Sequence, residues 1–324
     1  MIRRREFIAG LGTAAAWPLV ARAQQASMPV VGYLSSNVPQ SDPSRRDFLK
    51  GLGEAGFIEG RNVTIEYRYA RNEFARLPEL AADLVRRRVD VLATPNNAAA
   101  VAARAATTTI PIVFSVGGDP VALGLVASLS RPGGNVTGAS FLATGTTAKM
   151  LGMLHEVVPN ASIAALFNPA NPATEAEARE TLRAARIVHV KLDVLSAGNE
   201  QDIDAASQML LQHGIGGLII QGDPLFQGNL KQLAAFALRH TIPAIFQSRD
   251  FVDAGGLMSF GGTHREAANI SGLYVGRILG GKRPSDLPVQ QSTKIELVIN
   301  LATAKALGLT IPETLLATAD EVIQ

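Results

Sequence analysis

Residues 110–119 have the sequence IPIVFSVGGD, in which an apolar run ends in small and polar residues. An apolar run without alternation is typical of a parallel strand that is buried on both faces. Amphipathic stretches such as 42–55 and 74–87 separate the strand-like runs and predict helices. We therefore expect an α/β fold with two similar lobes, each built on a parallel sheet. The other strand-like runs are residues 29–34, 63–70, 89–94, 162–167, 190–195, 216–221 and 242–246.

Polar and small residues follow many of these runs, and this pattern predicts a ligand site. Ligands of parallel α/β sheets bind in the crevice outside the carboxyl ends of the strands. Hydroxyls, amides and free backbone N–H groups at these positions suit a small polar solute. Each residue taken singly has an alternative role, because Ser, Asn and Asp also cap helices. The candidate ligand-binding residues are Ser35, Ser36, Asn37, Asn96, Asn97, Ser115, Gly117, Asp119, Asn168, Asn171, Gln221, Asp223 and Asp250.

Two glycine motifs resemble nucleotide-binding sequences, but neither has the required context. Gly51, Gly53 and Gly56 satisfy the dinucleotide pattern, yet they end an amphipathic stretch instead of opening a helix after a strand. Residues 276–282 match the start of a phosphate-binding loop, but Arg283 stands where Ser or Thr would contact magnesium. No pair of histidines has zinc-ligand spacing, although His264 could line the crevice. We expect no catalytic residues, no metal and no cofactor.

The first 23 residues have the layout of a secretory signal peptide. Arg3, Arg4 and Arg5 precede an apolar segment of residues 7–20, and the sequence Ala-Arg-Ala follows at 21–23. The apolar segment is too short for a membrane span, which needs roughly 20 residues. Arg4, Arg5 and residues 6–8 also fit the twin-arginine pattern. We therefore expect cleavage near Ala23 and a periplasmic mature protein.

The mature chain then has a nearly balanced charge. The leader holds four arginines and one glutamate, so its removal changes the formal net charge from +2 to −1. The basic pI therefore belongs to the leader and does not indicate nucleic-acid binding. With no cysteine there is neither a disulfide nor a lipid attachment site after the leader. About 300 mature residues with 47% hydrophobic content suit two domains stabilised by their cores alone.

Several stretches closely resemble the ABC-transporter substrate-binding protein family (TrpX-like). They are residues 117–121, 124–138, 251–261 and 286–323. The resemblance implies a type I periplasmic binding-protein fold, with two Rossmann-like lobes, parallel sheets and three interlobe crossings. Residues 138–148 are expected to form the first crossing. The expected division puts residues 28–141 plus about 255–283 in lobe one, and residues 142–254 plus about 284–324 in lobe two.

The resemblance implies binding without chemistry. The protein would capture a small polar solute, with an amino acid or an aromatic acid as candidates, and deliver it as a monomer to an ABC permease. In this hypothesis, helix N-termini near Ser36 and Asn97 would hold a carboxylate, and Asp119 or Asp223 would pair with an ammonium group. Two alternatives stay open: an exported cofactor-dependent α/β enzyme, and a ligand-sensing module for a membrane receptor.

Overall fold

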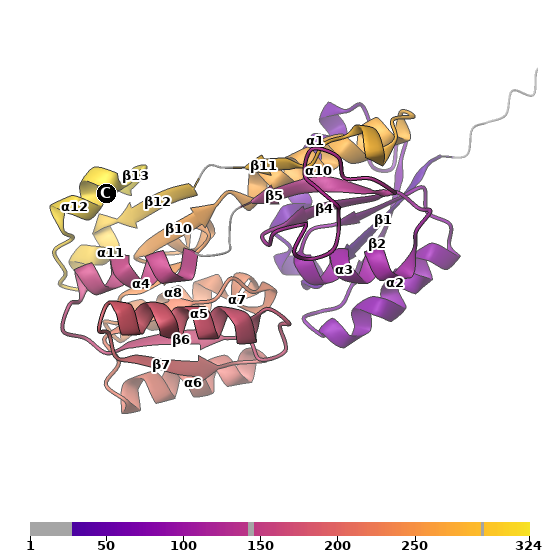
Figure 1. Cartoon of the computed structure of the whole chain (residues 1–324). Helices are drawn as coiled ribbons and strands as arrows, with labels where there is room; N and C mark the ends of the chain where they lie inside the picture. The colour runs from indigo at the N-terminus through magenta and orange to yellow at the C-terminus, as the bar shows by residue number, and fades with distance from the viewer. Residues whose placement is uncertain (1–27, 142–145, 293–294) are drawn as a thin grey trace, which may run out of the picture.

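The computed structural model describes residues 28–141, 146–292 and 295–324, so the expected leader lies outside the described residues. The described chain forms two α/β lobes, as the sequence predicts (Figure 1). Each lobe contains one sheet, and most of the apolar runs form the buried strands at its centre. Because those strands are covered on both faces, they contain few polar side chains. The runs 63–70 and 190–195 form edge strands that are only partly buried.

Lobe one is built on a six-stranded parallel sheet with the order β11-β5-β4-β3-β1-β2. Its strands are β1 Val30–Ser35, β2 Thr64–Tyr69, β3 Val91–Thr94, β4 Ile112–Val116, β5 Val136–Phe141 and β11 Gln290–Ser292. Its helices are α1 Ser44–Glu54, α2 Leu77–Arg86, α3 Asn97–Ala106 and α10 His264–Leu279, with short 3-10 turns at Pro39–Ser41, Phe74–Arg76 and Pro284–Asp286.

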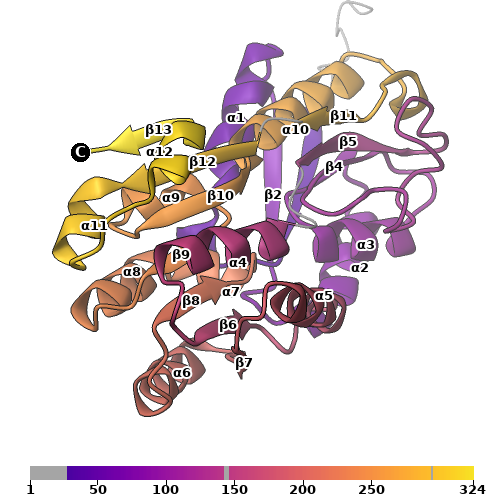
Figure 2. The ribbon, with the colours of Figure 1, turned by 60° about the vertical axis from the view of Figure 1, so that its left-hand side comes forward.

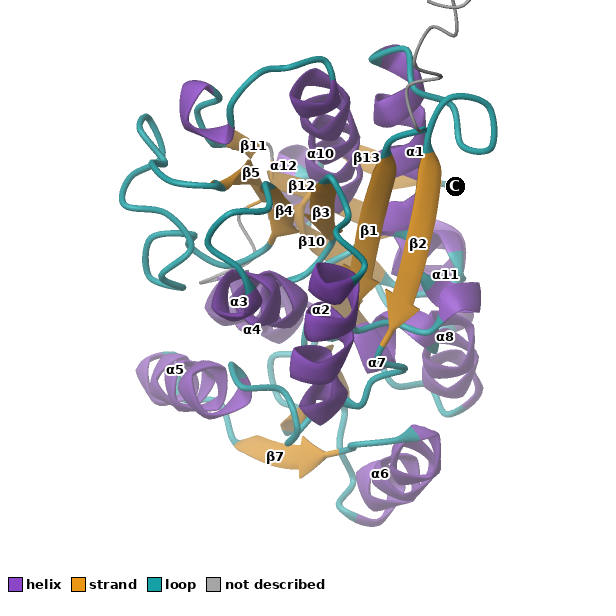
Figure 3. Ribbon diagram, turned by 90° about the vertical axis from the view of Figure 1, so that its right-hand side faces the viewer, coloured by secondary structure: helices purple, strands orange, loops and turns teal. Residues whose placement is uncertain are grey.

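Two apolar cores lie on the two faces of this sheet. Helices α1 and α10 cover one face, and α2 and α3 cover the other (Figure 3). Helices α1 and α10 pack closely because Gly51 has no side chain: a Cβ there would lie 1.9 Å from the carbonyl oxygen of Asn269. Gly56 has a φ of +90° just after α1, a conformation that glycine tolerates best. The Gly51–Gly56 motif therefore serves helix packing and helix termination, as its context predicts.

Lobe two is built on a seven-stranded sheet with the order β13-β12-β10-β9-β8-β6-β7. Only the β10–β12 pair is antiparallel. Figure 2 shows the C-terminus of the chain at the edge strand β13. The strands are β6 Ile163–Phe167, β7 Leu192–Ser196, β8 Gly217–Ile220, β9 Ala244–Phe246, β10 Met258–Gly262, β12 Ile295–Asn300 and β13 Glu321–Ile323. The helices are α4 Thr146–Val157, α5 Thr174–Ile187, α6 Glu200–Gln212, α7 Pro224–Gly228, α8 Leu230–Arg239, α9 Arg249–Asp253, α11 Leu301–Ala306 and α12 Glu313–Thr318.

The chain passes between the lobes three times, which agrees with the expected topology. The passages lie between β5 and α4, between β10 and α10, and between β11 and β12. The expected boundaries differ from the structure at two places. Strand β10 pairs in the second sheet, so lobe one resumes only at His264. Strand β11 pairs with β5, so lobe one extends to Ser292 instead of ending near residue 283.

Candidate functional site

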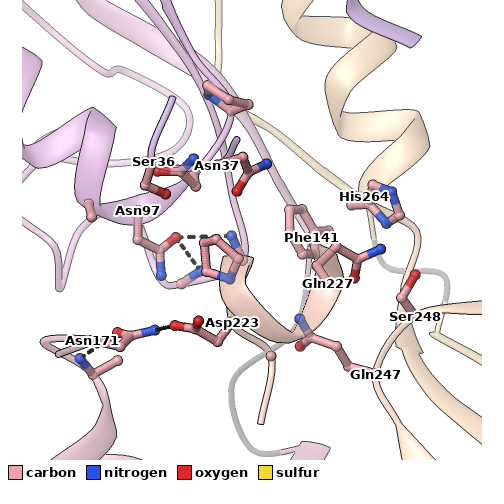
Figure 4. Close-up of a pocket in the computed structure, with 18 of the residues that line it drawn as sticks. Ser36, Asn37, Asn97, Phe141, Asn171, Asp223, Gln227, Gln247, Ser248 and His264 are labelled. Carbon is pink, nitrogen blue, oxygen red and sulfur yellow. Dashed lines mark hydrogen bonds between the residues drawn. The ribbon is translucent and has the colours of Figure 1, made fainter. Parts of the chain in front are cut away.

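A cavity of about 140 Å³ lies between the two lobes, where the carboxyl ends of their parallel strands face each other. Figure 4 shows polar side chains from both lobes around it. An apolar cavity of about 150 Å³ accommodates benzene, so this space suits a solute of roughly one ring. The polar residues of its wall are Ser36, Asn37, Ser44, Asn96, Asn97, Thr147, Asn171, Glu177, Asp223, Gln227, Gln247, Ser248 and His264.

The end of β1 supplies the first part of the lobe-one wall. Ser36 is fully buried, and its Oγ has no hydrogen-bond partner among the described residues. The Nδ2 of Asn37 donates to Oδ1 of Asp42 at 3.3 Å. A buried hydroxyl without a partner is costly, so Ser36 is a natural contact for a polar ligand.

The start of α3 supplies the second part of this wall. Asn96 caps the helix, since its side chain accepts from the backbone nitrogen of Ala99 at 3.1 Å. The Oδ1 of Asn97 accepts from the backbone nitrogens of Gly117 and Gly118 at 3.1 and 3.2 Å. Because these bonds occupy its oxygen, Asn97 keeps its Nδ2 for other partners. The helix N-terminus adds partial positive charge at the same place.

The facing wall, which belongs to lobe two, contains the buried carboxylate of Asp223. Asp223 accepts from Nδ2 of Asn168 at 3.0 Å, from Nδ2 of Asn171 at 2.7 Å and from the backbone nitrogen of Leu225 at 2.8 Å. Figure 4 shows the contact between Asn171 and Asp223. These hydrogen bonds lower the pKa of Asp223, but burial raises it by more, so the net shift is upward. The three donors hold the carboxylate in one orientation at the cavity.

Glu177, in the first turns of α5, adds a second carboxylate to this wall. Its Oε2 accepts from Nε2 of Gln221 at 2.9 Å. The Oε1 of Gln221 in turn accepts from the backbone nitrogen of Asn168 at 3.0 Å. Burial raises the pKa of Glu177, and the nearby Asp223 raises it further. Two carboxylates in one buried wall attract a cationic group, because each is costly to bury without one.

The third side of the cavity lies next to the passage between β10 and α10. Gln227 lines the cavity and donates to Oδ2 of Asp250 at 3.1 Å. Arg265 also donates to Asp250, and Nε2 of His264 lies 3.6 Å from it. Burial lowers the pKa of His264, so its imidazole is neutral at neutral pH. Asp250 thus joins a pocket residue of lobe two to the first turn of α10 in lobe one.

The structure brings one part of the sequence-predicted set to the cavity and places the rest elsewhere. The members that line it are Ser36, Asn37, Asn96, Asn97, Gly117, Asn171 and Asp223. His264 also lines it. The members that do not are Ser35, Ser115, Asp119, Asn168, Gln221 and Asp250.

The candidates outside the wall have other partners or other surroundings. Ser35 accepts from the backbone nitrogen of Asn37 at 3.2 Å, and Ser115 is buried inside β4. Asp119 is exposed and accepts from the backbone nitrogen of Val121 at 2.8 Å, as a turn-capping residue does. Of the two carboxylates expected to pair with a ligand ammonium, Asp223 lines the cavity and Asp119 does not. Asn168, Gln221 and Asp250 hold wall residues in place, as described above.

Sequence reasoning missed several residues of the wall. Phe74, Phe141 and Met150 give the cavity an apolar part, and Glu177 and Gln227 add polar groups. Glu177 lies within a helix, three residues after Thr174, where an exposed acidic side chain is ordinary. Phe141 and Met150 lie on either side of the first passage between the lobes. No local pattern distinguishes these residues from core or surface residues.

The profile of the family described as ABC transporter substrate binding protein matches residues 37–323. This match covers most of the chain. The chain belongs to that family. Members of the ABC transporter substrate binding protein family bind small-molecule solutes, work with ABC permeases and act outside the cytoplasm. They are not enzymes, which favours the binding alternative over the exported enzyme.

Individual relatives agree with membership of this family. A tyrosine-binding protein of Clostridioides difficile (strain R20291) is 27% identical over 272 residues, covering 84% of this chain and 78% of the relative. A crystal structure of a conserved domain protein from Vibrio cholerae is 30% identical, with a TM-score of 0.79 over 91% of this chain and 99% of that one. A ligand-free, open substrate-binding protein with adhesive properties from Clostridium difficile is 26% identical, with a TM-score of 0.60 over 91% and 99%.

Within residues 28–141, 146–292 and 295–324, no group of His, Cys, Asp or Glu side chains has an arrangement that could hold a metal ion. In the same ranges, no helix has the length and apolar character needed to cross a membrane.

Proposed function

We propose that this chain binds an aromatic amino acid between its two lobes and delivers it to the permease of an ABC importer. The mature protein would act in the periplasm after export and cleavage near Ala23. The observation that carries this proposal is the opposition of charge across the cavity. Lobe two presents the carboxylates of Asp223 and Glu177, and lobe one presents the amide of Asn97 and the N-terminus of α3.

The ammonium group of an amino acid fits the lobe-two wall. Asp223 and Glu177 are two negative groups that burial makes costly, and a cation placed between them lowers that cost. Asn168 and Asn171 keep the Asp223 carboxylate in position before the ligand arrives. Because the carboxylate is already held in place, binding costs less side-chain conformational entropy.

The carboxylate group fits the lobe-one wall. The first N–H groups of α3 carry partial positive charge, and Asn97 adds an amide nitrogen at the same end. The Nδ2 of Asn96 is buried without a hydrogen-bond partner among the described residues, so it offers a further donor. A zwitterion that touches both walls would favour the closed arrangement of the lobes by its contacts with each.

The side chain of the ligand fits the apolar part of the cavity. Phe74, Phe141 and Met150 line it, and aromatic rings pack well against such groups. The tyrosine-binding relative supports the same chemical class. The charges select an amino acid, and the apolar wall favours one with a large side chain.

A thermal-shift screen of the mature chain, residues 24–324, tests the proposal. The panel contains the common L-amino acids, aromatic acids, nucleosides and sugars. We expect aromatic amino acids to raise the melting temperature, since a ligand at 100 times its dissociation constant adds about 2.7 kcal/mol of stability. The only tryptophan, Trp17, lies in the leader, so intrinsic tryptophan fluorescence cannot replace this screen. A response to sugars or nucleosides alone, or to no compound, would overturn the proposal.

A further inference from the structure

The orientation of the Asn37 amide is determined by a residue outside the cavity. Its Nδ2 donates to Oδ1 of Asp42 at 3.3 Å. An ionised carboxylate only accepts hydrogen bonds, so Asn37 must turn its NH2 group toward Asp42. The carbonyl oxygen of Asn37 is then the end that remains for a ligand. Figure 4 shows Asn37 beside Ser36 on the wall of the cavity.

Asp42 is itself held from the core of lobe one. The hydroxyl of Tyr33 donates to Oδ2 of Asp42 at 3.0 Å, and the backbone nitrogen of Ser44 donates to Oδ1 at 3.2 Å. Burial raises the pKa of Tyr33 well above its usual value, so its hydroxyl keeps the proton that it donates. Tyr33 is 1% exposed, and its ring packs against those of Phe48 and Tyr67. Asp42 therefore has little freedom to move.

Rotation of the Asn37 amide would be costly in this arrangement. It would remove one hydrogen-bond donor from the Asp42 carboxylate and would place the carbonyl oxygen of Asn37 against a carboxylate oxygen. Ser36, the residue before Asn37, adds a buried hydroxyl without a partner among the described residues. The wall near β1 thus presents one fixed acceptor and one hydroxyl beside the apolar surfaces of Pro43 and Phe74.

We propose that Asn37 determines specificity by accepting a hydrogen bond from the polar tip of an aromatic side chain. Asp42 and Tyr33 are the positioning residues that keep its oxygen turned toward the ligand. This inference rests on the proposed function, in which Asp223 and Glu177 already receive the ammonium group. The cleft then prefers an aromatic side chain that carries an O–H or N–H group over a plain phenyl ring.

L-tyrosine and L-phenylalanine are the probes, because they differ by one hydroxyl. Isothermal titration calorimetry measures both dissociation constants with the mature chain. We expect wild type to bind tyrosine at least about tenfold more tightly, since a site built to bond a hydroxyl rejects the analogue that lacks it. The variant Asp42→Asn frees the Asn37 amide to turn, so the preference should fall toward one while phenylalanine binding stays within about twofold.

Two further variants keep this test decisive. Asn37→Ala should also reduce the preference, and it serves if Asp42→Asn does not fold. The matched control is Asp286→Asn, which changes an exposed carboxylate paired with Arg283 outside the cavity wall and should keep the wild-type preference. Equal affinities of wild type for both probes, or an unchanged preference in the folded cleft variants, would overturn the inference. Binding of both probes with equal affinity would leave the proposed function standing, whereas binding of neither would contradict both.

Discussion

The Nδ2 atom of Asn171 lies 2.7 Å from Oδ2 of Asp223, and both residues line the cavity between the lobes. Asn171 comes from the loop after β6, and Asp223 comes from the loop after β8. Strands β6 and β8 are parallel neighbours, so their carboxyl ends meet at the same edge of the sheet. This topology brings together two residues that are 52 positions apart in the chain.

Replacement of Asp223 should weaken ligand binding strongly. In Asp223→Asn the ligand ammonium loses a buried carboxylate partner, and such losses cost about 2–5 kcal/mol or a factor of 30 or more in affinity. The matched control is Asp119→Asn, because Asp119 is exposed and caps a turn. Calorimetric titration should give a wild-type dissociation constant for the control. Equal effects of the two substitutions would argue against the assignment of the ammonium site.

Ligand affinity should fall on acidification. Burial raises the pKa of both Asp223 and Glu177. Below those raised values the carboxylates are protonated and no longer attract a cation, so affinity should decrease by up to about tenfold per pH unit for each group. Titrations between about pH 7 and about pH 4, the range above the usual carboxyl pKa, measure this effect. A constant affinity over that range would contradict the ammonium site.

The stability of the ligand-free protein should respond in the opposite direction. A carboxyl whose pKa is raised by folding contributes stability that is complete below its unfolded pKa and is lost as the pH rises through the folded value. Asp223, Glu177 and Asp42 are in this class. As the pH rises, the free energy of unfolding should therefore fall less in Asp223→Asn than in wild type. Chemical unfolding at several pH values measures the difference, and parallel profiles would refute it.

Gly222 should tolerate no side chain without a loss of binding. A Cβ at this position would lie 2.1 Å from Nε2 of Gln247, which lines the cavity. In Gly222→Ala the Gln247 side chain must shift into or away from the ligand, so affinity should fall by about tenfold. Titration calorimetry measures this loss. Unchanged binding with a normal melting temperature would show that Gln247 has no part in holding the ligand.

Two glycines of α1 should respond in opposite ways to the same substitution. Gly51→Ala places a Cβ against the backbone of Asn269 in α10, and such overpacking costs about 1–3 kcal/mol or more. Gly53→Ala meets no atom within 4 Å, and alanine in a helix is favoured over glycine by about 0.5–1 kcal/mol. Urea unfolding of both variants provides the comparison. Similar stabilities of the two would contradict the close packing of α1 on α10.

The architecture was predictable because its signals are local. Each predicted run forms a strand, although the edge strands β2 and β7 are only partly buried, and the context of Gly51–Gly56 excludes a nucleotide loop. The lobe boundaries were less predictable near β10 and β11. Strand β11 has only three residues, and the pairing of both strands depends on the partner strands rather than on their own residues.

The site was predictable only where it follows the strand ends. Asn97, Asn171 and Asp223 each come directly after a strand or within its loop, so topology alone places them in the crevice. Glu177 comes from the first turn of α5, and Phe141 is the last residue of β5, before a passage between the lobes. Such residues reach the cavity only because the lobes face each other, which no local pattern encodes.

The central claim is that both lobes hold one aromatic amino acid, and a pair of titrations tests it most directly. Calorimetry with L-tyrosine compares wild type with Asn97→Ala in lobe one and Asp223→Asn in lobe two. The account predicts one site per wild-type chain and a loss of at least about tenfold in affinity for each variant. Wild-type affinity in either variant, with both proteins folded, would show that one lobe does not contact the ligand and would contradict the account.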